Sequence, residues 1–364
     1  MPTQANTMTL GNIGPLLDKQ VIHASAPCRI DFGGTLDISS FHYPLRHLSP
    51  STVNMALDRR TTVSLRPAAD HRVQITSAGF PDAAFHPASA PYDHPLGLMF
   101  AVADYFGAEG VHIHIDSTSP PKSGLGGSSV AAVALIAAFS KVLALIGKKT
   151  ISRNRMVLLA HAIEQGVAGV PCGLQDQLAA AFGGVNAWTW AADPGRPPFD
   201  RRTLLEADAI ARLDRHLLVA YLGVTHVSRD VNTTWVRQFI GGSGRANTPA
   251  INPLTHELSA APTPRGTRGA AQATDRGTAM RENITPPGHR RKGGPLGAAA
   301  PRWGAALGGV GPGPTGPRPR RRGRPGEERA GGPGTPEGRR TTPGPGGGGA
   351  PAARRARSRA CARE

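Results

Sequence analysis

The sequence is poor in cysteine and in aromatic residues. Its 364 residues include three cysteines, Cys28, Cys172 and Cys361, and aromatic side chains make up 5% of the chain. The cysteines form no pair at the spacing of metal-binding or redox motifs, so a disulfide framework is not expected. Such cysteine usage is typical of a reducing compartment, and we expect a cytoplasmic protein.

A signal peptide and an uninterrupted membrane-spanning segment are also missing from the sequence. The first residues, MPTQANTMTLGNIG, contain no basic segment followed by an apolar run. The longest apolar stretch, from Val130 to Ile146, contains Ser140 and Lys141. It also follows a glycine-rich loop directly, which favours a buried helix over a membrane span.

Negative charge is scarce near the C-terminus. The formal net charge is +17, and residues 286–364 supply +13 of it through 16 Arg and one Lys against four Glu. Residues 1–285 therefore carry only +4, which is ordinary for a globular protein. The basic character belongs to the tail and does not make the rest of the chain a nucleic-acid-binding surface.

The same tail lacks apolar periodicity. Gly, Pro and Arg fill 51 of its 79 positions, so it cannot bury enough surface to offset its ordering entropy. We expect residues 286–364 to be a disordered tail. Nucleic-acid binding through this tail is one alternative function, although Trp303 is its single aromatic residue for stacking on bases.

Before residue 262, apolar patterns predict both strands and helices. From β-branched residues and alternation, strands are expected at 21–34, 52–66, 73–77, 111–116, 185–190 and 216–224. Helices are expected at 95–106, 127–146, 152–165, 171–183, 230–240 and 251–261. Ser152 is the expected N-cap of its helix and Gly166 the expected end. After about residue 262 the periodicity fails.

The stretch PPKSGLGGSSVAA, from Pro120 to Ala132, places three glycines and two serines directly before a long apolar helix. Glycines let the backbone approach phosphate oxygens, and N–H groups at a helix N-terminus attract negative charge. The stretch is neither a Walker A motif nor a dinucleotide fingerprint. It predicts a phosphate-binding loop, with a tight packing turn as the alternative. The residues of this predicted loop are Lys122, Gly124, Leu125, Gly126, Gly127, Ser128 and Ser129.

Four charged residues are candidates for chemistry at this loop. Asp176 lies between two glutamines in apolar surroundings, where a carboxylate can accept a proton from an attacking hydroxyl. Arg29 can hold such a base ionised, and Glu164 can hold Mg²⁺. Asp37, shortly after Gly34, can accept hydrogen bonds from sugar hydroxyls. Each has a structural alternative: an ion pair for Arg29, and a cap or a solvated carboxylate for the acids.

Three segments occur in one order: APCRIDFGGTLD, then PPKSGLGGSS, then HAIEQGVAGVPCGLQDQ. This order resembles the GHMP kinases, the family of galactokinase, homoserine kinase, mevalonate kinase and phosphomevalonate kinase. The stretch GLQDQLAAAFGGVNAW looks most like the sugar-kinase branch, especially the heptose 7-phosphate kinases. The resemblance covers roughly residues 20–285.

The resemblance implies an α+β fold of two domains. It implies an N-terminal β-α-β catalytic domain at 15–192 and an incomplete ferredoxin-like domain at 193–285, before the tail. It also implies ATP- and Mg²⁺-dependent phosphorylation of a sugar or sugar phosphate, such as a heptose 7-phosphate or a galactose-like sugar. We expect no membrane or nucleic-acid partner.

The family's functional residues match positions of this sequence. By resemblance, Asp176 and Arg29 are catalytic, Ser128 and Glu164 hold the metal, and the glycine loop holds the ATP phosphates. The acceptor would be bound by Asp37, Gly34 and Gln175. The Asp37 match is looser, because this chain has GGTLD where heptose kinases tend to have a GGGTD-like run.

The family's third motif is a GAGGGG-like loop between apolar strands. The candidate here, PGPGGGGAP at 343–351, has no strand pattern on either side. Together with the abrupt change to Gly, Pro, Arg and Ala, this leads to the hypothesis of a reading-frame shift between about residues 260 and 290, or a truncation. A second alternative function is therefore an inactive kinase remnant.

Overall fold

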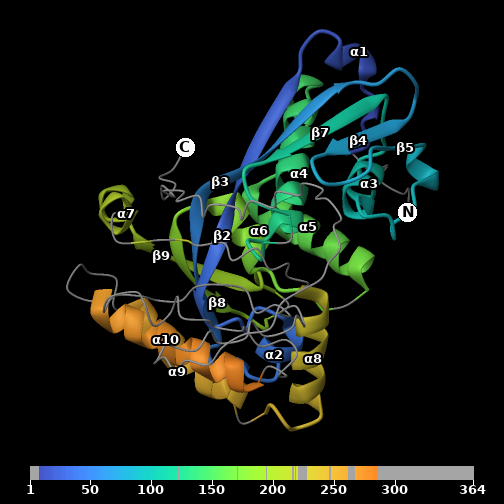
Figure 1. The fold of residues 1–364 in the computed structure, drawn as a ribbon. Helices are drawn as coiled ribbons and strands as arrows, with labels where there is room; N and C mark the ends of the chain where they lie inside the picture. Colours follow the sequence, from blue (N-terminus) through green and yellow to red (C-terminus); the bar gives the residue numbers. More distant parts are fainter. Residues whose placement is uncertain are drawn as a thin grey trace, which may run out of the picture.

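The computed structural model describes residues 8–284, except 122, 170, 194, 215–216, 218, 220–227, 246 and 261–266 (Figure 1). The predicted disordered tail and the candidate third glycine loop at 343–351 lie outside the described residues. Most of the strand predicted at 216–224 lies outside them too.

The first half of the chain is mainly strands. Its elements are β1 (Gly11–Asn12), α1 (Gly14–Leu17), β2 (Ile22–Gly33), α2 (Ser39–His42), η1 (Arg46–Leu48), β3 (Ser51–Pro67), β4 (Val73–Ser77), β5 (Ala83–Phe85), η2 (Pro87–Ser89), α3 (Gly97–Tyr105), β6 (Ala108–Glu109) and β7 (Val111–Ser117). The second half is mainly helices. Its elements are α4 (Gly127–Leu145), α5 (Arg153–Ala168), α6 (Gln175–Phe182), β8 (Val185–Trp190), β9 (Phe199–Leu205), α7 (Ala207–Asp214), α8 (Ser228–Ile240), α9 (Asn247–Ala260) and α10 (Thr267–Ile284).

Within the described residues, the predicted strands and helices lie close to their expected positions, and the predicted mixture of α and β structure is confirmed. Ser152 is the N-cap of α5, and its hydroxyl accepts a hydrogen bond from the backbone N–H of Arg155. The predicted end at Gly166 was wrong. The helix continues to Ala168, because Gly169 is the glycine that adopts the left-handed conformation, with φ of 64°.

A seven-stranded mixed sheet forms the centre of the fold. Its order is β5-β4-β7-β3-β8-β9, and β2 pairs with β3. The 17-residue β3 pairs with β8 through residues 51–55 and with β7 through residues 61–67, so one strand links both halves of the sheet. β9 extends the sheet beyond residue 192 by pairing with β8. The division into two domains stays a prediction.

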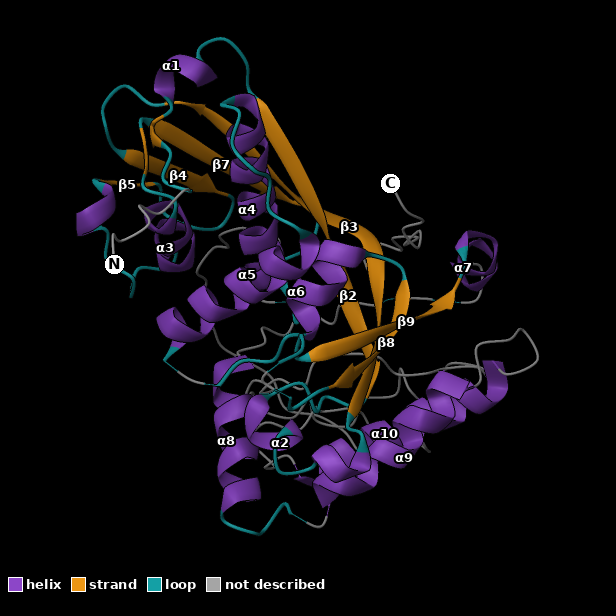
Figure 2. Cartoon of the chain, turned by 180° about the vertical axis from the view of Figure 1, so that it is seen from behind, coloured by secondary structure: helices purple, strands orange, loops and turns teal. Residues whose placement is uncertain are grey.

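Helices α3, α4, α5 and α6 form a layer against the sheet (Figures 1 and 2). α4 is the central helix of this layer, and residues such as Val133, Leu135 and Phe139 are completely or almost completely buried. It is long and apolar enough to cross a membrane, but 72% of its most apolar window is buried inside the protein. We interpret α4 as a core helix, as the sequence predicted.

A second helical layer, α9 and α10, packs against the opposite side of β2 and β3 (Figure 2). Leu258 of α9 and Ala273 of α10 form a small core with Val53 and Ala187. α10 was not predicted, because its sequence has little apolar periodicity. Its buried positions are small residues, such as Ala273, that let it lie close to α9.

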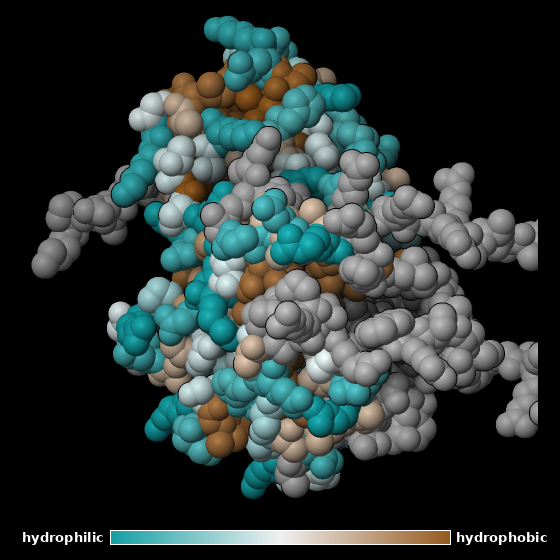
Figure 3. Space-filling view, turned by 90° about the vertical axis from the view of Figure 1, so that its left-hand side faces the viewer, coloured by the Kyte–Doolittle hydropathy of each residue, from teal (hydrophilic) through white to brown (hydrophobic). Residues whose placement is uncertain are grey.

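Where Figure 3 shows the described residues, hydrophilic side chains alternate with separate hydrophobic patches. Exposed large apolar residues occur among the described residues at scattered positions such as Val21, Tyr43 and Ile240. Scattered apolar side chains are normal on a protein surface and need no binding partner to explain them.

Candidate active site

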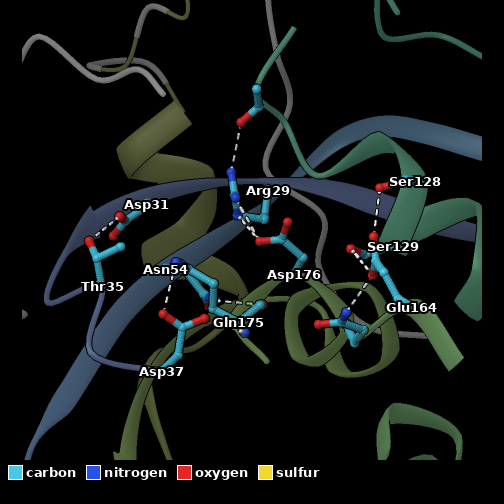
Figure 4. Close-up of polar contacts among 12 residues, drawn as sticks. Arg29, Asp31, Thr35, Asp37, Asn54, Ser128, Ser129, Glu164, Gln175 and Asp176 are labelled. Atoms are coloured by element: carbon cyan, nitrogen blue, oxygen red, sulfur yellow. Dashed lines mark hydrogen bonds and ion pairs between the residues drawn. The ribbon is translucent and has the colours of Figure 1, made fainter. Parts of the chain in front are cut away.

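Arg29 joins three segments that are distant in sequence (Figure 4). β2 has an irregular register between Pro27 and Arg29, and such irregularities re-aim a strand's side chains. The Arg29 guanidinium donates through Nε and Nη2 to Oδ1 of Asp176, at 2.6 Å each, and through Nη1 to the Gly124 carbonyl at 2.9 Å. Its backbone N–H donates to the Leu125 carbonyl at 3.2 Å.

The Arg29–Asp176 pair is a partly buried, charge-assisted contact. The two side chains are 14% and 22% exposed. Burial alone would lower the pKa of Arg29, but the carboxylates of Asp176 and Asp31 outweigh it and raise that pKa. The guanidinium is therefore a permanent positive charge beside Asp176.

Asp176 lies in the first turn of α6 with its two carboxylate oxygens in different surroundings. Oδ1 accepts both bonds from Arg29, whereas no described residue donates to Oδ2. Gly126 lies directly beside it: a Cβ on Gly126 would come within 3.1 Å of Asp176 Cγ and Oδ2. The geometry leaves Oδ2 as the oxygen available to take a proton at the glycine loop.

The glycine loop has the geometry expected of an anion-binding site. Gly124 and Gly126 have φ of 78° and 80°, in the left-handed region that favours glycine. Gly126 caps the 19-residue α4 without any side-chain hydrogen bond, so the first N–H groups of the helix lack a side-chain cap. A Cβ on Gly127 would meet nothing within 4 Å, so space lies open there. Lys122 lies outside the described residues.

Glu164 of α5 lies beside the start of α4 and accepts three side-chain hydrogen bonds. Ser128 and Ser129 donate to its two carboxylate oxygens at 2.8 and 2.6 Å, and Gln177 of α6 donates at 2.7 Å. Burial raises the pKa of Glu164, and the serine bonds oppose that rise. Sequence reasoning missed Gln177, which was visible only as the second glutamine flanking Asp176.

The oxygen ligands around Glu164 suit Mg²⁺. No group of three or more His, Cys, Asp or Glu that could hold a metal occurs in the described part of the chain. Mg²⁺ commonly binds through one or two carboxylates together with substrate phosphates, so a full protein cage is not required. Glu164 with the Ser128 hydroxyl, next to the open end of α4, fits that mode.

The three residues predicted to bind the acceptor are buried here. Asp37 is 2% exposed, and its Oδ2 accepts the backbone N–H of Gln175 at 3.1 Å. Gly34 packs against β3, where a Cβ would come within 2.1 Å of the Ser51 carbonyl oxygen. Gln175 directly precedes Asp176, and the role of Asp37, Gly34 and Gln175 in binding stays a prediction.

Sequence reasoning also missed Asp31, near the end of β2, and Thr35, in the loop that leads to Asp37 (Figure 4). Asp31 accepts bonds from the Gly33 N–H at 2.8 Å and the Thr35 hydroxyl at 2.9 Å. Thr35 has φ of 55°, which is strained for a β-branched residue. Such strain collects at functional sites. The Asp-x-Gly spacing was a signal for this turn, but nothing in the sequence predicts the conformation of Thr35.

The burial of Asp37 makes the free energy of unfolding depend on pH. Burial, together with the charges of Asp176 and Asp31, raises the pKa of Asp37 to about 7, despite the bond from Gln175. The folded protein therefore binds this proton more tightly than the unfolded chain, and stability is lost as pH rises from about 4 through about 7. A shift of this size corresponds to roughly 4 kcal/mol.

We expect Asp37→Asn to remove this loss, because the amide oxygen still accepts the Gln175 N–H and carries no charge. Denaturant unfolding of the variant and the unmodified protein at several pH values between 4 and 8 measures the difference. The stability of the variant relative to the unmodified protein should rise across this window. Parallel curves would show that Asp37 does not titrate there.

The comparisons with known proteins agree with this fold and this loop. Residues 94–184, which include the glycine loop, Glu164 and Asp176, match the family model described as GHMP kinases N terminal domain. The matched segment is about a quarter of the chain, and it contains the glycine loop and two of the residues that contact it. Residues 94–184 are similar to the N-terminal domain of the GHMP kinases, and the predicted resemblance is confirmed over these residues.

Two curated relatives are similar to parts of the chain. A galactokinase of Chloroflexus aggregans is 33% identical over 138 residues, covering 35% of this chain and 34% of the relative. A D-glycero-alpha-D-manno-heptose 7-phosphate kinase of Campylobacter jejuni is 44% identical over 75 residues, covering 20% and 21%. The matches thus span about a third and a fifth of the length of these relatives.

Solved structures share the fold over a larger part of the chain. A D-glycero-D-manno-heptose 1-phosphate kinase from Bacteriodes thetaiotaomicron has a TM-score of 0.55 at 15% identity, covering 72% of this chain and 80% of that one. Mevalonate kinase from Methanococcus jannaschii has a TM-score of 0.52 at 11% identity, covering 73% and 80%. At these identities the likeness concerns the fold.

Proposed function

We propose that the protein is an ATP- and Mg²⁺-dependent kinase that phosphorylates a hydroxyl group of a sugar or sugar phosphate. The observation that carries the proposal is the Arg29–Asp176 pair, held against a glycine loop at the N-terminus of a long helix. A base beside a phosphate-sized anion site is what direct phosphoryl transfer requires. The similarity to sugar kinases favours a sugar as the acceptor.

Each predicted residue receives a role in this proposal. Asp176 Oδ2 takes the proton of the acceptor hydroxyl. The hydroxyl oxygen bonds to the γ-phosphorus of ATP, and the bond between that phosphorus and the leaving ADP breaks. Arg29 orients Asp176, and both Arg29 and the N–H groups of the loop stabilise the developing negative charge. Residues Lys122, Gly124, Leu125, Gly126, Gly127, Ser128 and Ser129 would line the phosphate site.

Mg²⁺ would be held by Glu164 and Ser128, and would neutralise charge on the ATP phosphates when bound. Because the Ser128 hydroxyl already contacts Glu164, the carboxylate is oriented before the metal arrives. The acceptor would lie on the side of Asp176 that is bordered by Asp37, Gly34 and Gln175.

A cytoplasmic location, where ATP is available, belongs to the same proposal, as does the division into domains at 15–192 and 193–285.

Acceptor-dependent ADP release by the purified full chain tests the proposal. With ATP and Mg²⁺, we expect ADP release with galactose or with D-glycero-D-manno-heptose 7-phosphate, and none with mevalonate, the acceptor of the non-sugar relatives. Omitting Mg²⁺ should abolish release. If none of the acceptors stimulates release although ATP binds, the protein is an inactive remnant of a kinase and the proposed function is wrong.

A further inference from the structure

The first residue of α6 is held on both sides by buried side chains from elsewhere in the fold. Asp37, after β2, accepts the Gln175 N–H at 3.1 Å, and Asn54 of β3 donates through Nδ2 to the Gln175 carbonyl at 3.0 Å. Trp188 of β8 donates through Nε1 to Asn54 Oδ1 at 2.9 Å. We name Asp37, Asn54 and Trp188 the Gln175 clamp.

The Gln175 clamp is more completely buried than the pair it supports. Asn54 and Trp188 are 0% exposed, and Asp37 and Gln175 are 2% and 6% exposed. Hydrogen bonds in such surroundings are costly to break, because a buried polar group would be left without a partner. The clamp therefore holds the peptide groups on both sides of Gln175 in one orientation.

Local sequence does not provide this anchoring. Leu174, the N-cap of α6, makes no side-chain capping bond, so Asp37 supplies from 138 positions away what a neighbouring serine or aspartate usually supplies. Gly173 completes the fit, since a Cβ there would lie 1.8 Å from Asp37 Oδ2. Asp176 follows Gln175 directly, so its Cα position depends on the clamped peptide.

We propose that Asp37, Asn54 and Trp188 are positioning residues that fix the start of α6 so that Asp176 meets Arg29 and the acceptor hydroxyl. The inference rests on the proposed function for the role of Asp176. Errors of about 1 Å in the position of a reacting group cost roughly a hundredfold in rate. Loosening the clamp should therefore lower kcat while leaving the nucleotide site on α4 unchanged.

The same two strands offer a matched control. Thr52 of β3 accepts the Trp190 indole N–H at 3.1 Å, two residues from the Asn54–Trp188 pair on both strands. Thr52 and Trp190 are 0% and 2% exposed, yet no bond in the described structure joins them to α6. Asn54→Leu and Thr52→Val each leave one buried indole N–H without its acceptor, so both should cost stability. Asn54→Leu additionally removes the donor to the Gln175 carbonyl, which is the contact under test.

The experiment compares these two variants of the full chain by steady-state kinetics and by amide hydrogen exchange. In Asn54→Leu, we expect kcat to fall about tenfold or more, with the KM for ATP within about twofold. The backbone N–H groups of residues 174–179 should exchange faster. In Thr52→Val, kcat and exchange of this segment should match the unmodified protein although thermal stability falls.

Two results would overturn the inference. One is an Asn54→Leu variant with the kcat and the amide exchange of the unmodified protein. The other is an equal change in both variants, which would mean that Asn54 only stabilises the fold. If Asn54→Leu does not fold, Trp188→Phe against Trp190→Phe makes the same comparison while retaining an aromatic ring. If the unmodified protein transfers no phosphate, the proposed function is wrong. Amide exchange at residues 174–179 then still tests whether the Gln175 clamp fixes the start of α6.

Discussion

Asp176→Asn should abolish phosphoryl transfer while ATP still binds. Arg29 directs two donors at Oδ1, so the amide of the variant must turn its oxygen toward Arg29 and its NH₂ group toward the Oδ2 position. An NH₂ group cannot accept a proton. Loss of a general base costs about a hundredfold to ten-thousandfold in rate.

The kinetic constants and the affinity for nucleotide separate catalysis from binding in this variant. We expect kcat to fall by at least about a hundredfold, and calorimetric ATP affinity to stay within about threefold, because the glycine loop is unchanged. A variant that turns over like the unmodified protein would remove Asp176 from the mechanism. A variant that has lost ATP binding as well would place Asp176 in the nucleotide site.

Adjacent glycines of the loop should respond in opposite ways to alanine. At Gly126 a side chain must adopt φ of 80° and would lie 3.1 Å from the Asp176 carboxylate. The left-handed conformation alone costs about 1–2 kcal/mol. We expect Gly126→Ala to lower the free energy of unfolding by at least that amount and to displace Asp176, which lowers kcat.

Gly127→Ala should instead keep or raise stability, because alanine is the better helix former by up to about 1 kcal/mol and nothing lies within 4 Å of the new methyl group. The methyl group fills the open space in which the phosphates are proposed to bind. ATP affinity should therefore fall about tenfold or more, as a close phosphate contact with backbone N–H groups is lost.

Denaturant unfolding without nucleotide and calorimetric ATP titration measure both glycine variants. A Gly127→Ala protein that binds ATP normally would show that the phosphates do not approach this position. A Gly126→Ala protein of unchanged stability would mean that the loop relaxes away from Asp176. Gly127→Ala thus tests whether the loop binds phosphate, and Gly126→Ala tests whether the loop holds Asp176 in position.

The parts of the site that sequence could predict are those coded by neighbouring residues. The glycine loop and the helix after it are contiguous, so glycine spacing and apolar periodicity predicted α4 correctly. Glu164 and Ser128 were both proposed as metal ligands, but their contact depends on how α5 packs against α4. Periodicity gives the face of a helix and not its neighbour across the layer.

The rest required three-dimensional information for identifiable reasons. The binding of a sugar by Asp37 stays a prediction, and no signal in the sequence indicated that the Asp37 carboxylate accepts the N–H of Gln175 in α6. β9 was missed because its polar residues hide the strand pattern. One of them, Arg201, lies over the Phe182 ring, with its guanidinium carbon 4.9 Å from the ring centre. This charged residue therefore packs against an aromatic side chain.

The Arg29–Asp176 pair spans 147 positions of the chain, which bears on how the site comes into being. While the protein is being synthesised, β2 with Arg29 is made long before α6. A nascent chain that ends before Asp176 cannot form the pair. Neighbouring elements such as α4 and α5 can associate early, whereas contacts of high sequence separation form slowly. We therefore expect the Arg29–Asp176 pair to form late in folding, after the contacts between neighbouring elements.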